Sequence, residues 1–368
     1  MGYIILLIDY SYIFDIAKKF YSYLSFYDRY GKSLFPIRYF LDITYRCNLQ
    51  CSYCYLGNDR NKYELTTDEW INIINQIPSY GFISILGGEP ILRQDFREIF
   101  IAASERSIKK INLYTNATLL NESLIDDFIK YKLLCLSISL DGYGKKHDDN
   151  RGFNGAFDKI VNNLDIVIKK SHNKHKILID IKTILLNNNL EDIIPLYELC
   201  TKKNIDFFSI ALKRNNYLKQ YPYLREKITE EFYLQEYPIE PYFDMEKFKE
   251  VYKELLKIAK KSKTKIRWAP KFKPNEDGIK QIEYLFNHGK DNITNLYKPC
   301  LAPYSNLYIN PEGFIYPCLA VNMGSLREKS LKEIINLPKY RCFRKNLKAS
   351  KIFNACQLCC EAYPKNKE

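Results

Sequence analysis

Three closely spaced cysteines are the residues of this chain most able to do chemistry. Cys47, Cys51 and Cys54 have the spacing C-x3-C-x2-C in the segment RCNLQCSYC. Three thiolates on one loop can bind three irons of a [4Fe–4S] cluster and leave the fourth iron open. A zinc site or a purely structural cluster needs a fourth ligand, and none follows nearby. The spacing therefore favours a cluster with one iron free to bind a substrate.

A second group of cysteines lies near the C-terminal end. Cys300 and Cys318 belong to a C-x12-G-x4-C pattern, and Cys356 and Cys359 form a later C-x2-C pair. The chain has 11 cysteines, and an odd number without a secretory signal argues against a disulfide scaffold. The spacing alone permits a four-cysteine zinc site or an iron–sulfur cluster. Cys360 could replace Cys359 as a ligand.

The remaining cysteines are interpreted as packing residues. Cys135 and Cys200 stand alone within apolar stretches, which is typical of core cysteines. Cys342 lies in KYRCFRK and is either a free thiol near the active site or a packing residue. We favour packing for all three.

The composition describes a folded globular protein. The chain has 368 residues, of which 46% are hydrophobic and 27% are charged. These proportions exclude a disordered or collagen-like chain, and the length suggests about two domains. No stretch approaches the roughly 20 apolar residues of a membrane-spanning helix. The net charge of +13 favours an acidic partner or simply aids solubility.

Six apolar segments alternate with helical patterns from residue 37 onward, with amphipathic stretches such as 66–77 and 122–133 between them. The predicted strands cover residues 37–45, 82–86, 111–115, 135–140, 177–186 and 206–212. Strands that alternate with helices predict a parallel sheet with right-handed crossovers. Six such units fall short of a closed eight-stranded barrel, so we expect an α/β fold with a partial (β/α)6 TIM-like barrel or an open sheet. The active site should lie at the C-terminal ends of the strands.

Four regions follow from these patterns. Residues 1–36 form an amphipathic, aromatic segment that is predicted to be helical, either docked on the main domain or lying at a membrane surface or on a partner. Residues 37–215 form the partial barrel, and residues 216–295 form a helical linking region. Residues 296–368 form a small C-terminal domain with a β-hairpin that turns at Pro311–Gly313 and a helix near 330–337.

The cysteine loop after the first strand resembles that of the radical S-adenosylmethionine (SAM) superfamily. Gly87-Gly88-Glu89-Pro90 resembles the GGEP motif of that family, SISLDG at 137–142 resembles its ribose- and carboxylate-contacting strand, and HDDNRG at 147–152 resembles a further common stretch. Two positions depart from the pattern: Ala117 replaces the Gly of TNG, and Leu86 replaces Thr or Ser. The resemblance implies SAM contacts from Tyr53, Gly87, Gly88, Glu89, Pro90, Asn116, Ser137, Ser139, Asp141 and Arg151.

The C-terminal cysteines resemble the twitch domain, the one-cluster relative of the SPASM domain. A full SPASM domain has further cysteines after C-x2-C, and here only Cys360 follows. The resemblance therefore implies one auxiliary [4Fe–4S] cluster, held by Cys300, Cys318, Cys356 and Cys359. Together with the cluster on Cys47, Cys51 and Cys54, this gives two clusters and SAM as cofactors.

The resemblance also implies an activity. A radical SAM enzyme reductively cleaves SAM at its cluster, and the resulting 5′-deoxyadenosyl radical takes a hydrogen atom from the substrate. Relatives with a twitch or SPASM end mainly oxidise or cross-link ribosomal peptides, so a maturase or oxidoreductase of this kind is our first expectation. Dehydrogenation or other modification of a small molecule, such as a sugar, a cyclitol or a lipid headgroup, is the alternative. A non-enzymatic electron-transfer or metal-binding role is disfavoured because GGEP and SLDG serve SAM.

The expected partners follow from that chemistry. The cluster needs an electron donor such as flavodoxin or ferredoxin, and the substrate is a peptide or a small molecule. We expect no nucleic acid. Residues 1–30 offer a contact with a membrane surface, so we expect a cytoplasmic protein that is at most peripheral to the membrane. No residue is assigned here as a catalytic acid or base.

Overall fold

The computed structural model describes residues 22, 28–54, 56, 63–172, 174–213, 242–289, 292–318 and 321–365. Most of the predicted N-terminal helix lies outside these residues, as do residues 216–241 of the predicted linking region. The statements below concern the described residues.

Ten strands of the described chain form one sheet. In sequence order they are β1 (Arg38–Asp42), β2 (Phe82–Leu86), β3 (Ile111–Thr115), β4 (Cys135–Ser139), β5 (Leu178–Leu185), β6 (Phe207–Leu212), β7 (Lys265–Ala269), β8 (Asn306–Ile309), β9 (Phe314–Tyr316) and β10 (Gly324–Ser325). Their order in the sheet is β10-β9-β8-β1-β2-β3-β4-β5-β6-β7. Strands β1 to β7 pair in parallel, β8 pairs in parallel with β1, and β9 and β10 continue antiparallel.

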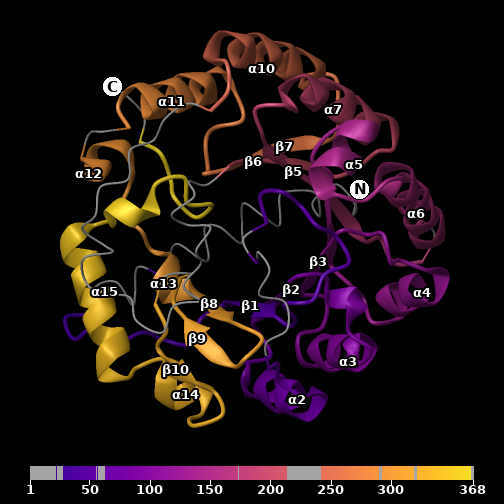
Figure 1. The fold of residues 1–368 in the computed structure, drawn as a ribbon. Helices are drawn as coiled ribbons and strands as arrows, with labels where there is room; N and C mark the ends of the chain where they lie inside the picture. The colour runs from indigo at the N-terminus through magenta and orange to yellow at the C-terminus, as the bar shows by residue number, and fades with distance from the viewer. Residues whose placement is uncertain are drawn as a thin grey trace, which may run out of the picture.

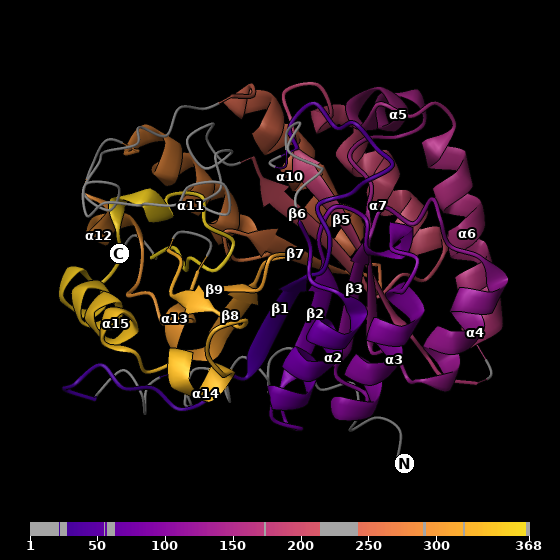
Figure 2. The same cartoon turned by 60° about the horizontal axis from the view of Figure 1, so that its bottom comes forward.

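Helices cover the outer side of the parallel strands as a ring (Figure 1). They are α2 (Thr67–Gln76), α3 (Phe96–Arg106), α4 (Glu122–Lys130), α6 (Ala156–Ser171), α7 (Ile193–Lys202), α10 (Met245–Ala259) and α11 (Glu276–Asn287), whereas the short helix α5 (Lys145–Arg151) lies beyond the C-terminal end of β4 (Figure 2). The C-terminal region adds α12 (Ile293–Leu296), α13 (Ala302–Ser305), α14 (Leu331–Ile334) and α15 (Pro338–Ser350). Figure 2 places this region beside β8 and β1. The arrangement is a partial TIM-like barrel with a C-terminal hairpin region, as predicted.

The main hydrophobic core lies between the sheet and the ring of helices. Because side chains alternate along a strand, one set of each strand packs outward and the other faces the barrel interior. On β5, Ile179 and Ile181 are buried in this core, whereas Asp180 and Lys182 point to the other face. The inner face of the barrel is therefore the polar face on which a substrate can lie.

The sequence located the six predicted strands closely, but it missed two later elements. The parallel sheet continues into β7, which lies in the region predicted to be a helical linker. The inner face of β7 carries Lys265 and Arg267. Because of these charged residues, the sequence pattern indicates a charged segment and not a strand. Helix α15 was also not predicted. The packing interpretation of Cys342, which lies on α15, is wrong, because this thiol is exposed.

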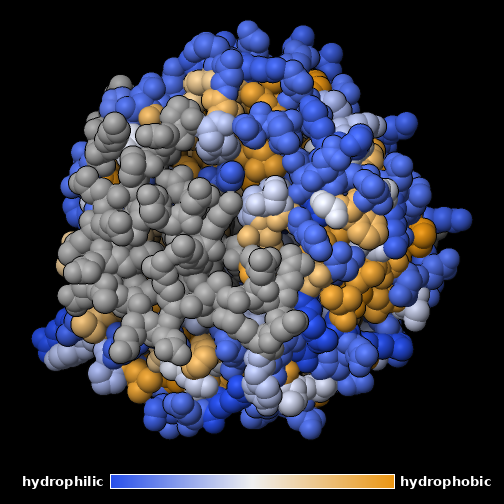
Figure 3. Space-filling view, in the orientation of Figure 1, coloured by the Kyte–Doolittle hydropathy of each residue, from blue (hydrophilic) through white to orange (hydrophobic). Residues whose placement is uncertain are grey.

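Figure 3 shows a mostly hydrophilic surface over the described helices of one face. Among the described helices, none combines the length and the apolar character needed to cross a membrane.

Candidate active site

The loop that carries Cys47, Cys51 and Cys54 begins directly after β1, at the C-terminal end of the parallel strands. The backbone N–H of Cys54 donates to the carbonyl of Cys51 at 3.1 Å, which closes a turn between the two cysteines. The N–H of Gln50 donates to the carbonyl of Arg151 at 3.1 Å and ties the loop to the end of α5. All three thiols are half-buried. The fold thus presents three cysteines where the strands converge.

Hydrogen-bond donors point at two of these sulfur atoms. The Leu49 N–H donates to Sγ of Cys47 at 3.4 Å, and Nδ2 of Asn116 lies 4.0 Å from the same sulfur. Nη1 of Arg151 donates to Sγ of Cys51 at 3.7 Å. Donors of this kind stabilise a thiolate and not a thiol. The residues present therefore fit a group that is bound through thiolates.

Burial acts against free thiolates in this loop. It raises the pKa of Cys47 to about 11, with a partly opposing contribution from the Leu49 N–H. Burial also raises the pKa of Cys51, and the Arg151 guanidinium opposes that effect. A bound metal replaces the proton on each sulfur, because a coordinating thiol is deprotonated outright. The loop is thus suited to metal-bound sulfur at neutral pH.

No three His, Cys, Asp or Glu side chains of the described part of the chain converge on a point that one metal ion could occupy. In a [4Fe–4S] cluster each thiolate binds a different iron, so its ligands do not need to converge on one point. The arrangement is therefore compatible with a cluster.

The two glycines of GGEP allow this segment to pack on the cysteine loop. Gly87 has φ +144°, and a Cβ at this position would lie 2.5 Å from the carbonyl oxygen of Thr44. A Cβ on Gly88 would collide with the carbonyl of Arg46. The N–H groups of Gly88 and Glu89 donate to the carbonyls of Thr44 and Arg46 at 2.7 and 2.8 Å. Larger residues would push the GGEP segment away from the loop that leads to Cys47.

Glu89 is fully buried and joins the end of β2 to the end of β3. Its carboxylate accepts hydrogen bonds from Oγ1 of Thr115 at 2.8 Å, from the Asn116 N–H at 2.7 Å and from the Ile91 N–H at 3.2 Å. Burial raises its pKa to about 7, although these three donors act to lower it. A carboxylate has about four acceptor positions, so these bonds leave room for one further donor. The predicted contact with the SAM amine would use that position.

We expect Glu89→Ala to weaken SAM binding without removing iron from the cysteine loop. The variant loses one charge-assisted contact with the amine, worth roughly 1.5–3 kcal/mol. It also releases Thr115 and Asn116. Equilibrium dialysis of SAM against reconstituted protein measures the effect, and Glu89→Gln, which keeps the shape, should lose less. An unchanged dissociation constant in the alanine variant would remove Glu89 from the SAM site.

Tyr53, Asp141 and Arg151 form one buried network beside the cysteines. The Tyr53 hydroxyl donates to Oδ2 of Asp141, and Nη2 of Arg151 forms an ion pair with the same oxygen. Oδ1 of Asp141 accepts from the Ile184 N–H at 2.6 Å. Since Arg151 also donates to Cys51, the network fixes the cysteine loop to the ends of β4 and β5.

Three further predicted SAM residues lie on neighbouring elements. Ser137 and Ser139 share the inner face of β4, and Oγ of Ser137 donates to Oδ1 of Asn112 at 3.2 Å. Pro90 is the first residue of a short 3-10 helix, Pro90–Leu92, that Glu89 caps by accepting from Ile91. The structure thus gathers the predicted SAM residues at one end of strands β1 to β4.

Sequence reasoning missed Asn48 as a partner within this site. Nδ2 of Asn48 donates to Oγ1 of Thr118, and Nδ2 of Asn116 donates to Oδ1 of Asn48, each at 2.9 Å. The side chains of Asn48 and Asn116 therefore connect the cysteine loop to the segment after β3. In the sequence, the only indication of this role is that an amide side chain follows Cys47 directly. Such a pair of residues does not by itself predict a contact.

The four predicted auxiliary ligands pack against one hydrophobic cluster. Cys300, Cys318, Cys356 and Cys359 all contact the main core, and Cys300 donates its N–H to the Lys351 carbonyl at 2.8 Å. The Cys359 N–H donates to the Cys356 carbonyl at 3.1 Å, so this pair forms a turn. These contacts place the four cysteines on the core of the molecule, and their role as the ligands of one cluster stays a prediction.

Cys359 and Cys360 share a neighbour on β8. Tyr297 lies near Cys359 and Cys356, whereas Tyr308 lies near both Cys360 and Cys359. Burial, together with the neighbouring Cys360 and Glu361, holds the pKa of Tyr308 well above its ordinary value. Tyr308 belongs to β8 and stacks on Phe40 of β1, with ring centroids 4.3 Å apart. Both thiols therefore lie beside β8, and the choice of Cys359 over Cys360 as the fourth ligand stays a prediction.

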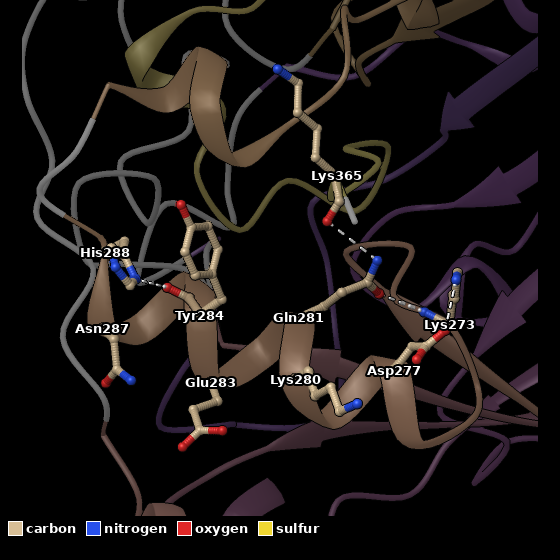
Figure 4. A pocket seen from close by; sticks show the side chains of 9 residues that line it. All are labelled: Lys273, Asp277, Lys280, Gln281, Glu283, Tyr284, Asn287, His288 and Lys365. Atoms are coloured by element: carbon tan, nitrogen blue, oxygen red, sulfur yellow. Dashed lines mark hydrogen bonds and ion pairs between the residues drawn. The ribbon is translucent and has the colours of Figure 1, made fainter. Parts of the chain in front are cut away.

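A pocket of about 480 Å³ lies along α11 (Figure 4). Three of its charged side chains form ion pairs: Lys273 pairs with Asp277 at 2.7 Å, and Glu283 pairs with Lys249 at 2.6 Å. None of its lining residues belongs to the predicted SAM or cluster sites. We therefore place the active site at the cysteine loop and not in this pocket.

Comparisons with known proteins identify two domains in this chain. Residues 41–200 match the model of the radical SAM superfamily, and residues 300–360 match that of the SPASM iron–sulfur cluster-binding domain. The chain is 26% identical over 336 residues to the AdoMet-dependent heme synthase of Methanosarcina barkeri, which covers 86% of each chain. It is 23% identical over 324 residues to the sporulation killing factor maturation protein SkfB of Bacillus subtilis, which covers 86% of this chain and 69% of SkfB.

A solved structure shares the fold. Streptococcus suis SuiB bound to S-adenosylmethionine superposes with a TM-score of 0.62 and 21% identity, covering 84% of this chain and 68% of SuiB. The two matched domains contain the two cysteine groups described above. The chain therefore contains a radical SAM domain, carries a SPASM iron–sulfur cluster-binding domain at its C-terminal end, and uses SAM and [4Fe–4S] clusters.

Proposed function

We propose that this protein modifies a ribosomally made peptide, by oxidation or cross-linking, inside the partial barrel. Cys47, Cys51 and Cys54 hold the cluster that binds SAM. Cys300, Cys318, Cys356 and Cys359 hold one auxiliary cluster. When bound, the first cluster supplies one electron to SAM, and the resulting 5′-deoxyadenosyl radical takes hydrogen from the substrate.

The observation that carries this proposal is the position of the C-terminal cysteine segment against the barrel. Oε1 of Glu361, two residues after Cys359, pairs with Nη1 of Arg38 on β1 at 3.4 Å. Oε2 of the same side chain lies 3.7 Å from Nζ of Lys271, just after β7. Glu361 thus links β1 to the opposite side of the open sheet. In this proposal both cysteine groups border the interior of the barrel, so that a substrate there is reached from each.

The protein's own residues have separate tasks in this proposal. Arg151 and Asn116 hold the sulfur atoms of Cys51 and Cys47 in their thiolate form. Asp141 fixes Arg151 and Tyr53, and the packing of Gly87 and Gly88 brings the GGEP segment next to the loop. A one-electron donor such as flavodoxin or ferredoxin reduces the cluster from outside. The barrel walls exclude water from the radical.

Names of relatives support a peptide substrate. SkfB is named as a maturation protein for the sporulation killing factor, and its match covers 86% of the present chain. SuiB, which shares the fold, has also been solved with its precursor peptide SuiA. A small-molecule substrate is the second candidate, because a relative of the same coverage is named as a heme synthase.

Deuterium transfer distinguishes these candidates. Reconstituted protein, SAM and reductant are mixed with perdeuterated peptides encoded next to the gene, or with small molecules that include tetrapyrroles. We expect deuterium in 5′-deoxyadenosine and a loss of hydrogen from one peptide. Transfer only from a small molecule would replace the peptide proposal with the second candidate.

A further inference from the structure

Four polar residues form one row across the inner face of the barrel. In the parallel register Ser139 of β4 pairs with Lys182 of β5, Lys182 pairs with Ser209 of β6, and Ser209 pairs with Arg267 of β7. Cα partners in adjacent strands lie on the same face, at a spacing of roughly 4.8 Å between strands. Two cations therefore stand in the same row as a residue that is predicted to contact SAM.

One carboxylate lies between these cations. Nζ of Lys182 pairs with Oδ2 of Asp180 at 2.9 Å, and Nη1 of Arg267 lies 3.9 Å from the same oxygen. Oγ of Ser209 donates to Oδ1 of Asp180 at 2.7 Å. The cluster thus has two positive charges and one negative charge, which leaves an excess of one positive charge.

The two cations are accessible, whereas the carboxylate is not. The side chains of Lys182 and Arg267 are 33% and 35% exposed, but that of Asp180 is only 4% exposed. The Asp180 carboxylate therefore lies against the sheet, beneath the side chains of Lys182 and Arg267. The exposed parts of Lys182 and Arg267 are available to a second anion from the barrel interior.

Aromatic rings hold the cations in place. The Arg267 guanidinium lies 3.3 Å from the centroid of the Phe207 ring, and Nζ of Lys182 lies 5.4 Å from the centroid of the Tyr114 ring. Such contacts favour a charged side chain in a fixed position. Burial acts to lower the pKa of Lys182, but the ion pair with Asp180 more than offsets it, so that Lys182 stays charged.

We propose that Lys182 and Arg267 form a carboxylate-binding site of the substrate pocket. A guanidinium binds a carboxylate through two parallel hydrogen bonds, and a lysine adds a third donor. Because Lys182 is one strand away from Ser139, the bound carboxylate lies beside the predicted SAM ribose. Resting on the function proposed above, this assigns the substrate an acidic side chain close to the residue that loses hydrogen.

A pair of small probes tests the site directly. N-acetyl-glutamate methylamide is titrated into the reconstituted protein with SAM and without reductant, and its glutamine analogue provides the uncharged comparison. We expect the glutamate probe to bind more tightly than the glutamine probe. Lys182→Gln and Arg267→Gln should each weaken the glutamate probe by about tenfold, since each removes a charge-assisted contact.

Two further variants separate a local site from general effects. Lys253→Gln removes one positive charge from an exposed position on α10, outside the barrel, and should leave the dissociation constant unchanged. Asp180→Asn removes the competing carboxylate and should tighten binding, which an unfolded protein cannot do. Equal binding of both probes, or an equal response to Lys253→Gln and Lys182→Gln, would overturn the site.

The result is independent of whether a peptide is the substrate. Probe binding that depends on Lys182 and Arg267, without modification of any peptide, would leave the carboxylate site standing and remove the peptide proposal. Modification of a peptide in which every Glu and Asp is replaced by Gln and Asn, at an unchanged rate, would do the opposite. A small-molecule carboxylate that competes with the glutamate probe would identify the other source of the same group.

Discussion

Replacing Cys47, Cys51 and Cys54 together by alanine should remove about half of the iron and all formation of 5′-deoxyadenosine. Two [4Fe–4S] clusters carry about eight irons per chain, and the triple variant should keep about four. The activity is lost because the cluster that binds SAM loses its three ligands. Iron analysis and chromatography of 5′-deoxyadenosine after anaerobic reconstitution measure both effects.

Cys342→Ala is the matched control for this experiment. Its thiol is exposed on α15, so its loss should change neither the iron content nor the cleavage of SAM. A triple variant that still cleaves SAM would show that the cysteine loop after β1 is not the SAM-binding site.

The second large effect concerns the C-terminal cysteines. Combining Cys300→Ala with Cys318→Ala should also remove about four irons, because the auxiliary cluster loses two of its four ligands. Cleavage of SAM should persist in part, since the cysteine loop and its partners Arg151 and Asn116 lie on other elements. Modification of the substrate should stop.

The same variant should destabilise the C-terminal region. Metal binding at a closed four-cysteine site contributes folding free energy directly. Thermal unfolding and limited proteolysis test this effect, while retained SAM cleavage shows that the barrel is still folded. Stoichiometric zinc with only about four irons in the unmodified protein would contradict the auxiliary [4Fe–4S] cluster.

The sequence predicted those elements whose conformation is determined by residues close together in the chain. Strands β2 and β3 match residues 82–86 and 111–115 because their apolar runs are short and bounded by turn residues. The hairpin turns at Pro311–Gly313, as predicted, because Gly313 has φ +87°, which glycine adopts without strain. The cysteine loop was recognisable from its spacing together with the GGEP and SISLDG segments.

The parts that the sequence did not predict depend on distant partners. Strand β7 has charged residues on its inner face, and only the register with β6 shows that Arg267 faces Ser209. Nothing in the cysteine-rich end of the sequence indicates that Glu361 has a partner. In the fold, this side chain contacts Arg38 and Lys271. The periodicity of apolar residues describes one helix or strand at a time. It therefore does not predict contacts across the barrel interior.

Electron paramagnetic resonance of the reduced protein, with and without SAM, shows which of the two clusters binds SAM. We expect the cluster on Cys47, Cys51 and Cys54 to have an open iron that binds SAM, and the C-terminal cluster to be closed by four thiolates. We predict that SAM changes the cluster signal of the unmodified protein and of the Cys300→Ala/Cys318→Ala variant. The signal that remains in the Cys47, Cys51 and Cys54 triple variant should not respond to SAM. A response to SAM in that triple variant, or none in the unmodified protein, would contradict the account.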